Sequence, residues 1–326
     1  MHAAANRFAL LDGLRGLAAI GVVLYHAAQS LMPGGHLAVD FFFILSGFVI
    51  GLNYRDRLAN GELGFARFTV LRIARFYPML LVGGLLAMWL LHAGPRILFL
   101  VPETWNRALF PGNPPFWSLL AELLVNILYA LVLVRLPWRW LAAICLLSAA
   151  LLVWNVNADP ATVTKGLGEL GAFWPQVIGG GLRTMFGFTA GLLLFTAWQN
   201  RKSPRRAARG ALAIPVALIV LLMIDFDQRR WWDLACVLLL LPALTWYAIR
   251  WEAPYPRLTR ALGDLSYPLY CIHVPILFVV DREQGPVLLV AAALVPLALL
   301  IDRFYDRPVR GFLTRLARGR MQAKAA

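Results

Sequence analysis

The chain has 326 residues, of which 60% are hydrophobic and only 15% are charged, and its mean hydropathy is +0.67. Soluble domains carry about 25% charged residues, so this composition excludes an ordinary soluble enzyme and indicates a chain that lies in a lipid bilayer. The three cysteines, Cys145, Cys236 and Cys271, each stand alone inside an apolar run. They suggest neither a disulfide framework nor a thiolate metal site, and we expect no metal.

Long apolar runs follow one another along the whole chain. A transmembrane helix needs about 20 mostly apolar residues, and about ten stretches approach or reach this length. They lie near residues 9–31, 37–53, 71–92, 117–134, 140–156, 172–196, 211–224, 232–249, 265–280 and 286–301. Because the connections are short, we expect an all-α, polytopic membrane bundle over residues 1–310, followed by a basic cytoplasmic tail over residues 311–326.

The net charge of +14 and the isoelectric point near 10.5 first suggest a polyanionic partner such as nucleic acid. If the chain begins on the cytoplasmic side, however, most lysine and arginine residues fall in tails and loops on that side, as in segments 55–67, 201–209 and 303–324. Cytoplasmic loops of membrane proteins carry such an excess. The positive charge therefore predicts that both termini are cytoplasmic, and it gives no reason to expect a nucleic-acid partner.

Charged and titratable residues inside the first span are the first candidates for function. A charged side chain in lipid costs roughly 2.5 to 3.5 kcal/mol or more, so such residues should face an interior cavity. Asp12, Arg15 and His26 share one stripe of the expected helix, because Arg15 and His26 are separated by about three helical turns. The alternative is an Asp12–Arg15 pair that fixes topology together with a structural histidine.

Two acids should lie at a depth close to that of His26. Asp40 begins the second span and Glu122 follows Trp117 in the fourth, and both spans enter from the outer side. Either carboxylate can orient an imidazole and hold its tautomer. The alternatives are a helix cap for Asp40, and for Glu122 a hydrogen bond to Trp117 or to a tyrosine of a neighbouring span.

The third and ninth spans each carry a polar face. Arg72 and Arg75 lie one turn apart near the cytoplasmic side and can grip phosphate oxygens, although arginines at span ends more often snorkel to lipid headgroups. Ser266, Tyr270 and His273 recur at positions i, i+4 and i+7. For His273, packing and substrate positioning are favoured over proton transfer.

Five sequence blocks occur in order across nearly the whole chain: LDGLRGLAAIGVVLYH, AVDFFFILSGFVI, RFTVLRIARFYP, FWSLLAE and LGDLSYPLYCIH, with a weaker FYDRPVR after them. With these blocks the sequence resembles the acyltransferase 3 family, whose bacterial members include O-antigen, exopolysaccharide and nodulation-factor O-acetylases. Cys271 stands where leucine is usual. Asp306 stands where glutamate is usual, which leaves its role open.

The resemblance implies transfer of an acyl group, most commonly acetyl, from cytoplasmic acyl-CoA to a hydroxyl of an extracytoplasmic or lipid-linked glycan. It implies a multi-pass protein of the bacterial cytoplasmic membrane, with acyl-CoA as co-substrate and no bound cofactor. His26 matches the family's essential histidine, Arg15 the arginine of the same motif, and Arg72 and Arg75 its paired basic residues.

Residue chemistry and resemblance together give one leading hypothesis. His26 acts as general base or as transient acyl carrier, with Glu122 or Asp40 orienting its ring. The substrate is then positioned by polar and aromatic side chains, namely Asp12, Trp117, Ser266, Tyr270 and His273. The rival hypotheses are a transporter or flippase for a small sugar or lipid-linked substrate, since polar stripes in membranes also mark transport paths, and a catalytically silent scaffold.

Overall fold

The computed structural model describes residues 8–201 and 208–322. Its helices are α1 (Ala9–Ala27), α2 (Ala38–Ala59), α3 (Phe65–Leu91), α4 (Phe116–Leu131), α5 (Trp138–Ala158), α6 (Thr162–Lys165), α7 (Val177–Arg201), α8 (Ala213–Met223), α9 (Arg229–Ala235), α10 (Leu241–Ala248), α11 (Pro256–Arg282), α12 (Val287–Ile301) and α13 (Arg307–Gln322). The described residues form no strand, and an isolated β-bridge joins Ala108 to Phe173. The all-α prediction is confirmed.

Every expected span coincides with a helical segment. Eight segments of the described chain are long and apolar enough to cross a membrane, and two shorter apolar helices, Phe116–Leu131 and Gly210–Met223, account for the other two expected spans. Two of the eight contain a π-helical turn: Cys236–Leu240 joins α9 to α10 in one segment, and Asp302–Asp306 joins α12 to α13 in another. The chain is therefore a multi-pass integral membrane protein.

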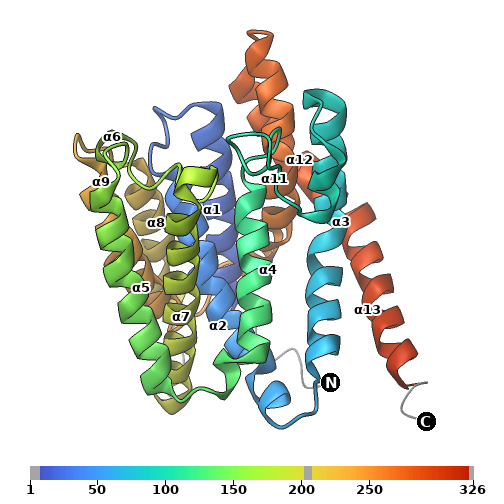
Figure 1. Cartoon of the computed structure of the whole chain (residues 1–326). Coiled ribbons are helices and arrows are strands. Elements are labelled where there is room, and N and C mark those ends of the chain that lie inside the picture. Colours follow the sequence, from blue (N-terminus) through green and yellow to red (C-terminus); the bar gives the residue numbers. More distant parts are fainter. Residues whose placement is uncertain (1–7, 202–207, 323–326) are drawn as a thin grey trace.

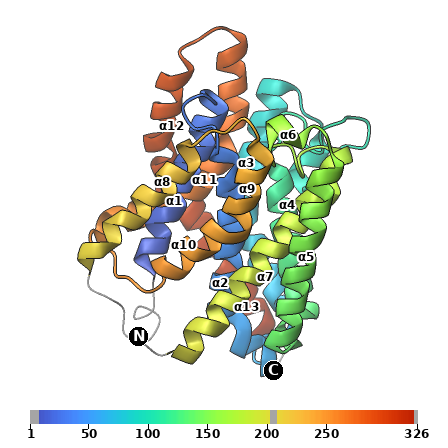
Figure 2. The same ribbon diagram turned by 90° about the vertical axis from the view of Figure 1, so that its left-hand side faces the viewer.

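The helices form one bundle in which α1 packs along α11, α2 along α7, and α7 along α5 (Figure 1). Figure 2 shows α8, α9 and α10 gathered beside α1. The end of the bundle where α2 ends, α3 begins and α13 ends is here named the basic end. The opposite end, which carries the connections 92–115 and 159–176, is named the loop end (Figure 1).

Close helix contacts hold the two central pairs together. A Cβ atom on Gly47 of α2 would lie 2.0 Å from the carbonyl oxygen of Phe188 in α7, and one on Gly16 of α1 would lie 2.3 Å from that of Leu262 in α11. Such distances leave room only for glycine, and small residues at membrane helix contacts let backbones approach in this way. These contacts fix α1, α2, α7 and α11, the helices that carry most of the candidate site.

The last helix crosses the boundary expected at residue 310, because α13 runs from Arg307 to Gln322. The π-helical turn Asp302–Asp306 connects it to α12. Residues 323–326 of the expected tail and residues 202–207 of the basic segment 201–209 lie outside the described residues.

Candidate active site

Three cavities follow one another between the basic end and the loop end. The basic cavity, of about 540 Å³, is lined by Tyr54, Arg57, Arg67, Leu71, Arg72, Arg75, Arg307, Arg310, Gly311, Thr314 and Arg315. The middle cavity, of about 30 Å³, is lined by Arg15, Val39, Phe42, Phe43, Ser118, Leu119, Glu122, Ser266, Tyr267 and Tyr270. The histidine cavity, of about 60 Å³, is lined by Val22, Tyr25, His26, His36, Val39, Pro114, Pro115, Trp117, Gly168, Ala172, Arg183 and Tyr270.

Shared residues and one ion pair connect the three cavities. Val39 and Tyr270 line both the middle cavity and the histidine cavity. Arg72 of the basic cavity lies 3.6 Å from Glu122 of the middle cavity, measured from Nη2 to Oε1. Arg15 and His26 therefore line neighbouring cavities on the same side of α1, as their spacing predicts.

The basic cavity has an excess of positive charge. Arg310 pairs with Asp306 at 2.9 Å, and Arg307 contacts Asp264 and Asp302. Among the residues that the structure describes, no carboxylate pairs with the other arginines at the mouth, Arg57, Arg67, Arg75 and Arg315. A cavity lined by several unneutralised guanidinium groups suits a ligand with more than one phosphate.

Glu122 does not orient His26, and that prediction is wrong. Its Oε1 accepts a hydrogen bond of 2.7 Å from the Ser46 hydroxyl, and the same oxygen faces Arg72. The sequence places Glu122 at the same depth in the bilayer as His26. It does not show to which side of its helix the Glu122 side chain points. α4 packs against α2 and α3 as well as α7, and Glu122 contacts Ser46 of α2 and Arg72 of α3. Trp117 and the tyrosines are likewise not its partners in the described chain.

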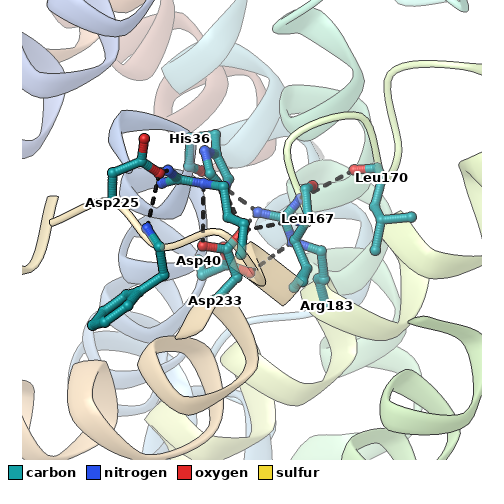
Figure 3. A network of polar contacts seen from close by, with 9 residues as sticks. His36, Asp40, Leu167, Leu170, Arg183, Asp225 and Asp233 are labelled. Carbon is teal, nitrogen blue, oxygen red and sulfur yellow. Dashed lines mark hydrogen bonds and ion pairs between the residues drawn. The ribbon is translucent and has the colours of Figure 1, made fainter. Parts of the chain in front are cut away.

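Asp40 is also turned away from His26, and it is not a helix cap. Its two carboxylate oxygens accept hydrogen bonds from Nε and Nη2 of Arg183, at 2.9 Å and 2.5 Å (Figure 3). Both side chains are buried, with exposures of 0% and 1%. Arg183 also donates to the carbonyl oxygens of Leu167 and Leu170. The pair thus ties α2, α7 and the segment after α6 together.

The partner of His26 is another histidine. His26 Nδ1 lies 2.9 Å from the carbonyl oxygen of Val22 and 3.3 Å from Nε2 of His273. Nδ1 of His273 lies 2.8 Å from the carbonyl oxygen of Tyr270. A carbonyl only accepts, so Nδ1 of each ring carries the proton. Nε2 of the neutral His26 ring therefore keeps its lone pair, as a general base or nucleophile requires.

The other expected positioning residues are spread along the path. Trp117 lines the histidine cavity, and its ring centroid lies 5.8 Å from the guanidinium carbon of Arg183. Ser266 lines the middle cavity and donates to the carbonyl oxygen of Gly263 at 2.7 Å. The Tyr270 hydroxyl lies 2.6 Å from Ser118 Oγ. Asp12 lies against Gly263 where α1 meets α11, and it is not among the described residues that line the three cavities.

Sequence reasoning missed two parts of this arrangement. His36 and Asp233, which form a buried contact beside the histidine cavity, were not expected to take part. The available signal was an isolated acid, Asp233, within an otherwise apolar span. The arginines of α13 were assigned to topology alone, because nothing in the sequence shows that this helix packs against α3.

Comparison with known proteins gives the same family as the sequence blocks. The family model described as an acyltransferase domain matches residues 8–301. Protein 2 in the picA locus of Rhizobium radiobacter is 34% identical over 157 aligned positions, which cover 38% of this chain and 82% of that protein. The peptidoglycan O-acetyltransferase OatA of Listeria monocytogenes is 26% identical, over 93% of this chain and 56% of that protein.

The chain thus spans little more than half the length of the Listeria relative. No solved structure matches it. The family match extends from the residue before α1 to the last residue of α12 and so includes His26, Arg15, Arg72 and the helices that surround them. On this evidence the chain belongs to the acyltransferase 3 family of membrane proteins.

Proposed function

We propose that this protein moves an acetyl group from cytoplasmic acetyl-CoA to a hydroxyl of a glycan or lipid-linked sugar on the other side of the bacterial cytoplasmic membrane. The observation that carries the proposal is the series of cavities that leads from unneutralised arginines at one end to His26 near the other. The excess of lysine and arginine near the basic end supports a cytoplasmic location for that end.

The donor enters at the basic cavity. Coenzyme A carries a diphosphate and a 3′-phosphate, and planar guanidinium groups bind such oxygens in bidentate fashion. Arg72 and Arg75 line this cavity, while Arg15 lies deeper, in the middle cavity. The flexible pantetheine arm carries no charge, so it suits the narrow middle section, and it directs the thioester toward His26.

The transfer itself needs one base at the meeting point of the two substrates. His26 Nε2 removes the proton of the acceptor hydroxyl while the oxygen attacks the thioester carbonyl. The carbon–sulfur bond then breaks, and the departing thiolate of coenzyme A takes the proton from His26. In the two-step variant, Nε2 first attacks the thioester carbonyl, the carbon–sulfur bond breaks, and the thiolate of coenzyme A leaves while His26 carries the acetyl group. The acceptor oxygen then attacks this acetyl group, the carbon–nitrogen bond to Nε2 breaks, and the hydroxyl proton passes to the thiolate.

The proposed function is tested on cells and on the purified protein. Surface glycans from cells with the chain should carry ester-linked acetyl groups that are absent from cells without it, as measured by mass spectrometry. The purified protein should bind acetyl-CoA and consume it when a glycan acceptor is present. Movement of a sugar across vesicles without consumption of acetyl-CoA would contradict the proposal and support the transporter.

Removal of one arginine from the basic cavity should weaken donor binding selectively. In Arg75→Gln we expect the dissociation constant of acetyl-CoA to rise about 10- to 100-fold, because one charge-assisted hydrogen bond is worth about 1.5 to 3 kcal/mol. Isothermal titration calorimetry with the protein in detergent measures it. Arg139→Gln is the matched control, since Arg139 packs on Trp138 and lines none of the three described cavities. Equal affinity in both variants would contradict the assignment of the basic cavity to the donor.

A further inference from the structure

A second histidine lines the same cavity as His26. His36 lies in the short 3-10 turn Gly35–Leu37 that leads into α2, and only 6% of it is exposed. Its Nε2 atom lies 2.7 Å from Oδ2 of Asp233 in α9 (Figure 3). The same carboxylate oxygen accepts a hydrogen bond of 2.8 Å from the backbone N–H of Leu167. The imidazole of His36 is therefore held in one orientation by a fully buried acid.

The contact with Asp233 determines where the lone pair of the neutral ring lies. A carboxylate accepts hydrogen bonds, so Nε2 of His36 carries the proton and donates it. The lone pair then lies on Nδ1. This atom is buried and has no hydrogen-bond partner among the residues that the structure describes. A buried polar atom without a partner costs about 1 to 3 kcal/mol and calls for an explanation such as a bound ligand.

The surroundings of His36 indicate what kind of ligand it accepts. Aromatic rings of Tyr25 and Trp117 line the histidine cavity, and the ring centroid of Tyr25 lies 5.4 Å from that of His36. The nearest acids already have partners, since Asp233 contacts His36 and Asp40 pairs with Arg183 (Figure 3). An uncharged ligand with an apolar face and a hydroxyl group fits aromatic walls and one buried acceptor atom. A sugar ring has both features.

We propose that His36 binds a hydroxyl of the acceptor sugar through Nδ1, and that Asp233 positions the ring for this contact. The inference rests on the proposed acyl transfer and adds the acceptor side to it. His26 and His36 then have separate roles in one cavity. The first takes the proton of the attacking hydroxyl, and the second holds the sugar through a hydrogen bond that it accepts.

Two substitutions of His36 separate sugar binding from a purely structural role. In His36→Gln the amide nitrogen reaches the place of Nε2 and donates to Asp233, but no polar atom remains at the place of Nδ1. In His36→Asn a polar atom remains near Nδ1, and the contact with Asp233 is lost. Sugar binding predicts that His36→Gln lowers glycan acetylation about tenfold, the effect of losing one hydrogen bond. Its acetyl-CoA affinity and melting temperature should equal those of the unmodified protein.

A third variant blocks the site and leaves the bonds of His36 in place. A Cβ on Gly168 would lie 3.0 Å from the Tyr25 hydroxyl and 3.7 Å from Cγ of His36. Its backbone does not have a positive φ. Gly168→Ala therefore places a methyl group in the histidine cavity, and it should also lower glycan acetylation with unchanged acetyl-CoA binding. If His36→Gln does not fold, Gly168→Ala alone tests whether the histidine cavity binds the acceptor sugar.

The readouts are the alkali-released acetate of surface glycans, calorimetric binding of acetyl-CoA and the melting temperature in detergent. The proposal is overturned if His36→Gln or folded Gly168→Ala acetylates glycans at the unmodified level, or if only His36→Asn loses both stability and acetylation. Failure of the proposed function has a different signature, since the unmodified protein would then neither bind acetyl-CoA nor add acetate to glycans.

Discussion

Replacing His26 with alanine is expected to lower acetyl transfer by about 10²- to 10⁴-fold, the usual contribution of a general base. Nε2 of this ring bears the lone pair because Nδ1 faces the Val22 carbonyl and His273. Our mechanism assigns the removal of the acceptor proton to His26 alone. The measurement is acetate on surface glycans from cells in which the variant is the only copy, with consumption of acetyl-CoA by the purified protein alongside.

The matched control is another histidine of the same chain. His92 is exposed at the end of α3, with a φ of 55°, and asparagine adopts this left-handed conformation readily. His92→Asn should therefore retain full activity. Binding of acetyl-CoA by His26→Ala should also be unchanged, because the arginines of the basic cavity are intact. Full glycan acetylation by His26→Ala would contradict the mechanism and leave the silent scaffold as the better account.

Labelling of the unmodified protein separates the two forms of the mechanism. If His26 carries the acyl group, the unmodified protein incubated with labelled acetyl-CoA and no acceptor should retain label on a peptide that contains His26. Direct transfer predicts no such label under these conditions. Isolation of the labelled peptide would eliminate direct transfer. Absence of the label, in a protein that turns over rapidly once acceptor is added, would eliminate the covalent intermediate.

The sequence was informative about helices and about the faces of single helices. Apolar runs located every span, because burial in lipid imposes a composition that is visible in one sequence. The helical repeat then placed Arg15 and His26 on one face of α1, and Ser266, Tyr270 and His273 on one face of α11. In the structure these residues line two adjoining cavities or contact a residue that does.

The partners of buried charges were harder to predict, because they depend on how helices are rotated against one another. Their expected depth in the bilayer made Glu122 and Asp40 equally plausible neighbours of His26. The rotation of α4 directs Glu122 to Ser46, and the packing of α7 brings Arg183 to Asp40. Such a pair cannot be recognised from the sequence, because Asp40 and Arg183 are 143 residues apart. The same reason explains why His36 and Asp233 were missed.

Removal of either member of the Asp40–Arg183 pair is expected to destabilise the protein by about 3 to 5 kcal/mol, the usual cost of leaving one buried charge without its partner. In Asp40→Ala the buried guanidinium of Arg183 keeps its contacts to backbone carbonyl oxygens but loses the carboxylate that pairs with it directly. Thermal unfolding in detergent should show a clearly lower melting temperature for Asp40→Ala and for Arg183→Ala.

The double variant Asp40→Leu/Arg183→Met tests whether the pair is structural. Replacing both members of a buried ion pair by apolar residues of similar size is often neutral or stabilising, so this variant should melt at a higher temperature than either alanine variant and regain glycan acetylation. If Asp40→Ala melts like the unmodified protein and nevertheless loses acetylation, the carboxylate acts on the reaction itself. Its pairing with Arg183 would then be secondary to a role beside His26. Recovery of both stability and acetylation in the double variant would instead show that the charges only hold α2 and α7 in register around the histidine cavity.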